Sequence, residues 1–288
     1  HVMSWFDGFE TQRFEVNGAS ILARHSRQAI GQPRKPALLL LHGFGSSLQT
    51  WAAWGPPLSR QYRVIRLDLP GFGLTGASPT RNYTDLGDIA TLTHFADRLG
   101  LARFGVIGHS LGGKIAWSLA AAVPERITAL VLMAPDGFAP PDQWNSKPYE
   151  VPAFMGLMKY SLPKPLIAHF LGAAFSDPQW LTPAMVTRYH EMLRAPGVRQ
   201  AILDRAAQTI YANPVLQLQQ IKAPTLLLWG ENDRMIPSSN AELYAQVLPQ
   251  SQTVILPQLG HVVQEEQPEL GLAQVRAFLN THLPPLQR

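Results

Sequence analysis

One segment of the chain places a serine in a pattern typical of a nucleophile. Residues 105–114 read Gly-Val-Ile-Gly-His-Ser-Leu-Gly-Gly-Lys, so Ser110 is the centre of a Gly-x-Ser-x-Gly pentapeptide between an apolar run and a helical pattern. So tight a turn needs glycine at Gly108 and Gly112, and it exposes the serine hydroxyl at the N-terminus of the helix. A serine that only caps the helix is the alternative interpretation, and the strand-turn-helix context favours the nucleophile.

A serine hydroxyl becomes an effective nucleophile when a histidine removes its proton and a carboxylate orients that histidine. Asp233 follows the apolar run 226–229, and His261 comes shortly after the next run, 254–256. The carboxyl ends of parallel strands meet at one edge of a sheet, so we expect the three side chains to converge there. The sequence therefore predicts a catalytic triad of Ser110, Asp233 and His261 that works through a covalent acyl-enzyme.

The elements that must position these residues alternate between short apolar runs and longer amphipathic runs. The short runs predict a β-hairpin followed by six buried strands, and the longer runs predict helices. The predicted strands are 11–16, 20–25, 37–41, 63–67, 103–107, 127–133, 224–229 and 252–256. The predicted helices are 49–58, 85–99, 111–123, 183–193, 239–247 and 268–282. This alternation predicts an α/β fold with a mostly parallel sheet flanked by helices.

The alternation stops near Asp136 and resumes at the run that starts with Pro224. We expect a core domain formed by residues 1–136 and 216–288, with a helical cap or lid subdomain, 137–215, inserted after the sixth strand. The cap is rich in proline, methionine and aromatic residues, which suits the roof of an apolar pocket, although each side chain could instead belong to the cap's own core. The substrate-binding candidates are His109, Phe138, Trp144, Met158 and Val262.

Composition excludes several classes of protein. Hydrophobic residues make up 46% and charged residues 15% of the 288 residues, which excludes a disordered chain. No apolar run approaches the roughly 20 residues that span a bilayer, so integral membrane association is not expected. The net charge is +4, but the basic residues are scattered, so we expect no nucleic-acid partner. The chain has no cysteine, which excludes a disulfide or a thiolate metal site.

No metal and no cofactor are expected, and the oligomeric state is left open. His1 and Val2 look like a remnant that precedes Met3, and the first residues carry no charged segment followed by an apolar one. We therefore expect a cytoplasmic location, with export not excluded.

From about Glu10 to Leu283 the chain resembles the α/β-hydrolase fold superfamily. The positions that match its nucleophile, acid and base are Ser110, Asp233 and His261. Residues 39–45, Leu-Leu-Leu-His-Gly-Phe-Gly, match the loop that supplies one oxyanion donor, and residues 68–73 match a second recurring loop. The resemblance implies that the backbone N–H groups of Phe44 and Leu111 form the oxyanion hole.

Four other features have simpler interpretations than catalysis. We expect His42 to be a buried, hydrogen-bonded support rather than a second base, and His109 to pack beside the nucleophile. Glu231 is an alternative acid, but the resemblance favours Asp233. Residues 71–76 match Gly-x-Gly-x-x-Gly, yet no helix follows whose N-terminus could hold phosphates, so nucleotide binding is not expected.

The resemblance narrows the reaction without fixing it, because the superfamily hosts many activities. Its dehalogenases and epoxide hydrolases use aspartate where this chain has Ser110. Its carbon–carbon hydrolases usually carry Gly-Gly-Gly-Pro after the oxyanion histidine and tryptophan after the catalytic histidine, whereas this chain has Gly-Phe-Gly-Ser and Val262. We predict a carboxylesterase or lipase-like enzyme for small apolar esters, including polyester fragments. The alternatives are a carbon–carbon hydrolase, a perhydrolase or acyltransferase, and a non-catalytic interaction protein.

Overall fold

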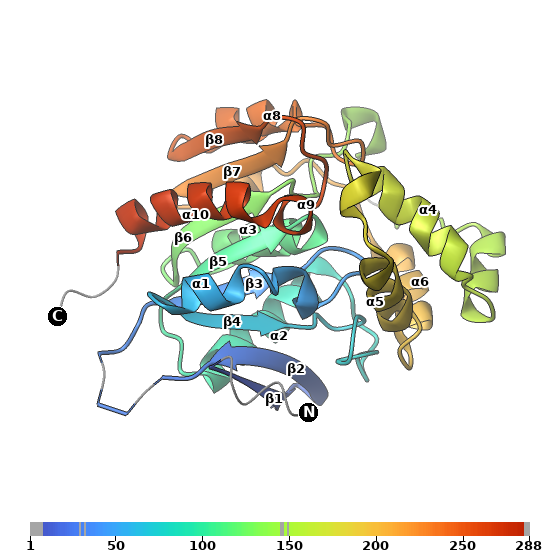
Figure 1. Cartoon of the computed structure of the whole chain (residues 1–288), viewed down its shortest axis with the longest axis horizontal. Helices are drawn as coiled ribbons and strands as arrows, with labels where there is room; N and C mark the ends of the chain where they lie inside the picture. Colours follow the sequence, from blue (N-terminus) through green and yellow to red (C-terminus); the bar gives the residue numbers. More distant parts are fainter. Residues whose placement is uncertain (1–7, 29, 32, 145–146, 149, 285–288) are drawn as a thin grey trace.

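An eight-stranded sheet carries the fold of the computed structural model, in the order β1-β2-β4-β3-β5-β6-β7-β8 (Figure 1). The strands are β1 (Phe9–Val16), β2 (Ala19–Ser26), β3 (Ala37–Leu41), β4 (Arg63–Leu67), β5 (Phe104–His109), β6 (Ile127–Met133), β7 (Thr225–Gly230) and β8 (Ser251–Leu256). β2 pairs antiparallel with β1 and β4, and the other pairings are parallel. The predicted α/β fold with a mostly parallel sheet is confirmed.

The structure describes residues 8–28, 30–31, 33–144, 147–148 and 150–284. The predicted remnant at His1 and Val2 lies outside these residues. Within the described ranges, no helix has both the length and the apolar character that a membrane crossing needs.

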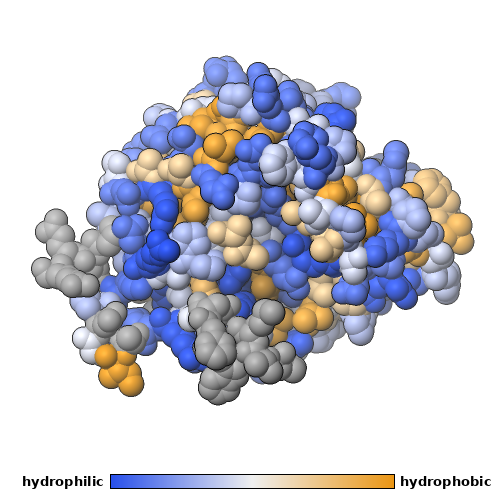
Figure 2. Space-filling model, viewed as in Figure 1, coloured by the Kyte–Doolittle hydropathy of each residue, from blue (hydrophilic) through white to orange (hydrophobic). Residues whose placement is uncertain are grey.

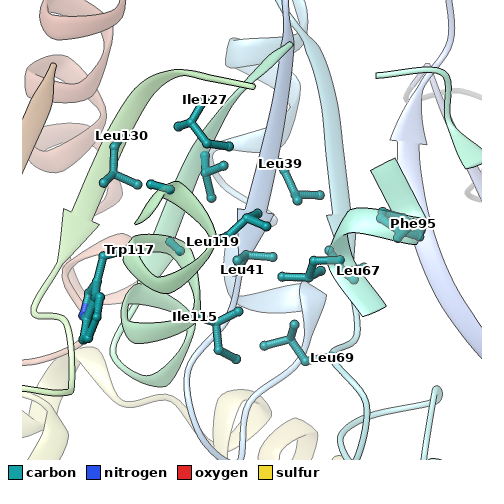
Figure 3. Close-up of a cluster of buried hydrophobic side chains, with 14 of the residues drawn as sticks. Leu39, Leu41, Leu67, Leu69, Phe95, Ile115, Trp117, Leu119, Ile127 and Leu130 are labelled. Carbon is teal, nitrogen blue, oxygen red and sulfur yellow. The ribbon is translucent and has the colours of Figure 1, made fainter. Parts of the chain in front are cut away.

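Helices cover both faces of the sheet because the side chains of each buried strand alternate between the two faces. On one face lie α2 (Asp85–Arg98), α3 (Leu111–Ala122) and α8 (Asn240–Val247), and on the other lie α1 (Gly55–Ser59) and α10 (Pro268–His282). Leu39 and Leu41 of β3 pack on the α3 face, where Figure 3 shows them beside Ile115 and Leu119 of α3. The neighbouring residues of β3, Leu38 and Leu40, pack on the α10 face. These two cores hold the strand ends in fixed positions.

Two predictions about helices were wrong in detail. The helix predicted over 49–58 is a 3-10 turn, η2 (Leu48–Trp51), followed by the separate helix α1. Two prolines cause the break, because proline fits only the first turn of a helix and α1 has its prolines there. The apolar spacing of residues 85–99 predicts Leu86 on one face of the helix with Ile89 and Leu92, but Leu86 lies in the first turn of α2 and is 79% exposed.

Helices also fill the interval between β6 and β7, and the described residues there contain no strand. The elements are η3 (Pro141–Gln143), η4 (Ala153–Lys159), α4 (Lys164–Ala174), η5 (Pro178–Trp180), α5 (Pro183–Leu193), α6 (Val198–Gln208) and α7 (Val215–Leu218). Figure 1 shows α4, α5 and α6 together at one end of the sheet. The division of the chain into a core domain and a cap subdomain stays a prediction.

Candidate active site

Ser110 lies between the end of β5 and the start of α3, in a strained conformation. Its φ is +54° and its ψ −117°, a region that non-glycine residues rarely adopt. A Cβ added to Gly108 would lie 2.3 Å from the carbonyl oxygen of Gly112, and one added to Gly112 would lie 2.3 Å from the carbonyl oxygen of Leu41. Both glycines are therefore needed for the turn that carries Ser110.

Asp233 and His261 meet at the same edge of the sheet. Asp233 follows β7, His261 follows β8, and His261 Nδ1 lies 2.7 Å from Asp233 Oδ2. The other carboxylate oxygen of Asp233 accepts hydrogen bonds of 2.9 Å from the backbone N–H groups of Met235 and Ile236. With Nδ1 donating to Asp233, the neutral imidazole keeps the lone pair of Nε2 for a proton.

His109 connects the serine turn to the histidine loop. Its Nε2 donates to the backbone carbonyl of His261 at 2.8 Å, and the two rings lie 4.7 Å apart. Burial, with a smaller contribution from His261, holds the pKa of His109 well below its usual value. His109 is therefore neutral, and its hydrogen bond holds the backbone of His261 close to the turn that carries Ser110. Among the described residues, no hydrogen bond joins the Ser110 hydroxyl to His261, and such bonds often tighten only in the substrate complex.

The loop after β3 lies against the serine. A Cβ added to Gly43 would lie 3.2 Å from the Cβ of Ser110. His42 supports this loop: its Nδ1 donates to the Gly43 carbonyl at 2.8 Å, and its Nε2 accepts from the N–H of Leu69 at 3.0 Å. Burial lowers the pKa of His42 to about 4, so the ring is neutral, as this pair of hydrogen bonds requires.

The two N–H groups predicted to stabilise an oxyanion come from this loop and from α3. The N–H of Leu111 belongs to the first residue of α3, where no intrahelical acceptor exists. Neither it nor the N–H of Phe44 donates a hydrogen bond to another described residue. Their role as donors to an oxyanion, aided by the positive end of α3, stays a prediction.

A cavity of about 580 Å³ opens beside Ser110. Its apolar side chains include Phe44, Leu86, Leu111 and Ile210, and its charged ones include Asp85, Lys114 and Asp136. Lys114 lies one helical turn beyond Ser110 and forms an ion pair of 3.3 Å with Asp85. The lining of the cavity therefore combines apolar and charged side chains.

None of the five predicted substrate-binding residues lines this cavity. Phe138 packs against the ring of Tyr244 at 5.1 Å, and Val262 packs in a small buried cluster with Phe175. His109, Trp144 and Met158 are likewise absent from the cavity lining. Glu231, the alternative acid, instead accepts a hydrogen bond of 3.1 Å from the N–H of Gln258.

Sequence reasoning missed Glu266, at the end of α9 (Val263–Glu266), which is 1% exposed. One of its oxygens accepts the N–H of Gly260 at 2.8 Å, and the other accepts the N–H groups of Ser176 and Asp177 at 3.0 and 3.2 Å. The N–H of His261 in turn donates to the Ala174 carbonyl at 2.8 Å. The loop that carries His261 is thus tied to the segment between α4 and η5. No local sequence pattern predicts this role of Glu266.

Glu265, also missed, ties α5 to the core. Its carboxylate accepts from the hydroxyl of Thr50 at 2.8 Å and from the hydroxyl of Tyr189, and it pairs with Arg188. The hydroxyl of Ser46, in the loop that contains Phe44, donates to the Tyr189 hydroxyl at 3.4 Å. Burial, and next the charge of Glu265, raise the pKa of Tyr189, so its hydroxyl stays protonated as a donor. The described residues contain no group of three or more His, Asp or Glu side chains arranged to hold a metal ion.

Comparisons with known proteins identify the family to which this fold belongs. A family model described as alpha/beta hydrolase fold matches residues 36–268. A dihydrolipoyllysine-residue acetyltransferase component of an acetoin cleaving system, from Pseudomonas putida, is 31% identical over 251 residues, which cover 85% of this chain. The match spans 64% of that relative's length.

Two further matches concern hydrolases. A 2-hydroxy-6-oxo-6-(2'-aminophenyl)hexa-2,4-dienoic acid hydrolase from Metapseudomonas resinovorans is 26% identical over 278 residues, which cover 93% of this chain and 91% of the relative. The crystal structure of a membrane phospholipase A, a bacterial virulence factor, superposes with a TM-score of 0.80 at 29% identity and covers 98% of this chain and 89% of that one. The chain belongs to the α/β-hydrolase fold family, as a hydrolase.

Proposed function

We propose that this hydrolase cleaves carboxylic esters of apolar substrates through an acyl-enzyme on Ser110. The observation that carries the proposal is the hydrogen bond of 2.7 Å between His261 Nδ1 and Asp233 Oδ2 at the edge of the sheet that also bears the strained serine turn. A buried carboxylate that orients a neutral histidine is what activation of a serine hydroxyl requires.

In the proposed reaction, His261 Nε2 removes the proton of the Ser110 hydroxyl as its oxygen attacks the ester carbonyl carbon. The N–H groups of Phe44 and Leu111 stabilise the oxyanion of the tetrahedral intermediate. His261 then gives its proton to the departing alcohol, which leaves the acyl group on Ser110. A water molecule, deprotonated by His261, attacks the acyl-enzyme and releases the carboxylic acid while the proton returns to Ser110.

The cavity supports a small or medium-sized ester. Its volume of about 580 Å³ lies within the range of ligand sites. Phe44, Leu86 and Ile210 offer apolar contacts to an acyl chain, and Lys114 offers a hydrogen-bond donor to a polar part of the substrate. Similarity to the membrane phospholipase A supports an ester bond as the target. Polyester fragments belong to the same class of substrate.

The test is hydrolysis of a series of chromogenic esters, from short to long acyl chains, by the wild type and Ser110→Ala. We expect the variant to lose at least about 10³-fold in kcat. A serine-directed phosphonate should label the wild type but not the variant. Ser161→Ala, which removes an exposed hydroxyl, is the matched control and should keep full activity. Equal activity of Ser110→Ala would overturn the proposal.

The relative from Metapseudomonas resinovorans supports a second candidate, in which the same residues hydrolyse a carbon–carbon bond. The sequence of the Phe44 loop and the valine after His261 favour the ester. Ser110-dependent cleavage of a 2-hydroxy-6-oxo-dienoic acid, without hydrolysis of any ester, would favour the second candidate. The acetyltransferase relative makes acyl transfer a further reaction to examine, by product analysis with alcohol or peroxide acceptors.

A further inference from the structure

The stretch from η4 to η5 exposes several large apolar side chains. Phe154 is 72%, Tyr160 85% and Phe170 61% exposed. The other exposed apolar residues of the stretch are Leu157, Leu166 and Trp180. Soluble proteins rarely leave such side chains together at the surface unless the patch binds something.

The local helix geometry gathers these side chains into rows. Residues three apart are eclipsed in a 3-10 helix, so Phe154 and Leu157 of η4 lie in one row, which Tyr160 at the C-terminal end continues. Leu166 and Phe170 are four residues apart on α4 and share one face of that helix. We call Phe154, Leu157, Tyr160, Leu166 and Phe170 the η4–α4 surface. Figure 2 shows apolar residues at the end of the molecule where η4 and α4 lie in Figure 1.

The segment that carries the η4–α4 surface contains basic residues and no acidic ones, with Glu150 and Asp177 directly at its two ends. Residues 151–176 contain Lys159, Lys164 and His169 and no aspartate or glutamate. Lys159 is exposed and forms no ion pair with any described residue, and Lys164 donates to the neutral hydroxyl of Thr187. Among the described residues these two lysines therefore have no acidic partner, and their charges attract an anionic surface.

An apolar hollow adjoins the same helix. A cavity of about 330 Å³ between α4 and α5 is lined by Pro165, Ala168, Pro183 and Val186, with Lys164 also in its lining. An aliphatic chain fits the apolar walls, and a phosphate beside that chain could accept from the ammonium group of Lys164. A hydrophobic hollow with a cation at its side matches the chemistry of an anionic phospholipid.

We propose that the η4–α4 surface docks this protein on an anionic lipid bilayer. Exposed apolar rows flanked by lysines are typical of helices that lie in the membrane interface, with the apolar side chains about 5–10 Å deep and the lysines among the headgroups. A second copy docked through the same surface would add further lysines and no carboxylate from residues 151–176, whereas anionic headgroups supply the opposite charge. The proposal is independent of the chemistry at Ser110.

The experiment is cosedimentation of the intact protein with vesicles of phosphatidylcholine alone and of equimolar phosphatidylcholine and phosphatidylglycerol. We expect binding to the anionic vesicles that weakens as salt is added. Phe154→Ser with Phe170→Ser should lower the partition coefficient at least about tenfold. Lys159→Glu should lower it about fivefold or more. Leu216→Ser, at an equally exposed leucine of α7, is the matched control and should bind like the wild type.

The circular dichroism spectrum and the urea unfolding midpoint should be unchanged in all these variants, which shows that they are folded. The proposal is overturned if the wild type binds neither kind of vesicle, or if the double variant binds as strongly as the wild type. It is also overturned if sedimentation velocity shows that the wild type self-associates through this surface and the double variant does not.

Discussion

Glu266 holds His261 through a single intervening residue: its carboxylate accepts the N–H of Gly260, directly before His261, at 2.8 Å. The other oxygen of Glu266 accepts two N–H groups from residues 176 and 177. The buried carboxylate therefore uses both oxygens as acceptors, and three backbone groups depend on it. The position of the proposed base depends on this contact between the His261 loop and the segment after α4.

Glu266→Gln should misplace His261. The amide must turn its NH2 group toward at least one of the N–H donors, so one hydrogen bond is lost. We expect kcat for a short ester to fall up to about 100-fold with KM little changed, since the defect concerns the base and not the cavity. Glu269→Gln, in the first turn of α10, is the control and should match the wild type. Titration with the phosphonate measures the concentration of folded enzyme. If unfolded protein accounts for the whole loss of kcat, the proposed positioning role of Glu266 is contradicted.

Leu86 should limit the length of the acyl chain. It lies in the first turn of α2, is mostly exposed and lines the cavity beside Ser110. Leu86→Trp fills part of that cavity, so we expect kcat/KM to fall about tenfold for long-chain esters and little for acetate esters. Leu270→Trp introduces the same side chain at an exposed position of α10 and should change neither rate. Equal losses for short and long esters would show that the acyl chain lies elsewhere.

The buried side chains of His42 and Asp68 should change the stability of the fold in opposite directions as the pH falls. Burial lowers the pKa of His42 from 6.5 to about 4, so below pH 6.5 the unfolded chain binds a proton that the folded one does not, and stability falls as the pH drops. Burial raises the pKa of Asp68 from 3.8 to about 6, so its contribution to stability is largest below pH 3.8 and is lost as the pH rises toward 6. Between about pH 4 and 6 the two effects offset each other.

Asp68→Asn removes one of the two effects. The variant should lose stability on acidification from pH 6 to 4 more steeply than the wild type, by about 1 kcal/mol per pH unit. Urea unfolding at several pH values measures the difference. Asp142→Asn, at an exposed carboxylate, should leave the slope as it is in the wild type. Parallel slopes for Asp68→Asn and the wild type would mean that Asp68 does not hold its proton in the folded state.

Arg205 should contribute to stability mainly by neutralising Asp88. From α6 its guanidinium donates to both oxygens of Asp88, at 2.7 and 3.1 Å, and both side chains are buried. Arg205→Met leaves a buried carboxylate without its cation, so we expect a loss of about 3–5 kcal/mol in unfolding free energy. Adding Asp88→Leu should restore most of it. Arg81→Met, which breaks an exposed ion pair between α6 and the core, should cost less than about 1 kcal/mol. An equal loss for the Arg205 and Arg81 variants would contradict this account.

The sequence by itself determined the sheet and the turn that carries Ser110. β3, β4 and β6 have the predicted bounds because a buried strand needs a short apolar run and a polar or glycine-rich end, and both signals are local. The steric need for glycine at positions 108 and 112 is equally local, since the turn that requires it spans a few residues. The convergence of Asp233 and His261 followed from the rule that parallel strands end at one edge.

Only the tertiary structure decided what surrounds the serine. Leu86 and Lys114 line the cavity while Phe138 and Trp144 do not, because the lining depends on how the helices between β6 and β7 lie across the sheet. No period in the sequence encodes that placement, and apolar residues of these helices serve a core as readily as a pocket. The role of Glu266 depends on backbone groups 90 residues away. In the sequence it is one of two consecutive glutamates shortly before Pro268, and nothing in that local pattern predicts its role.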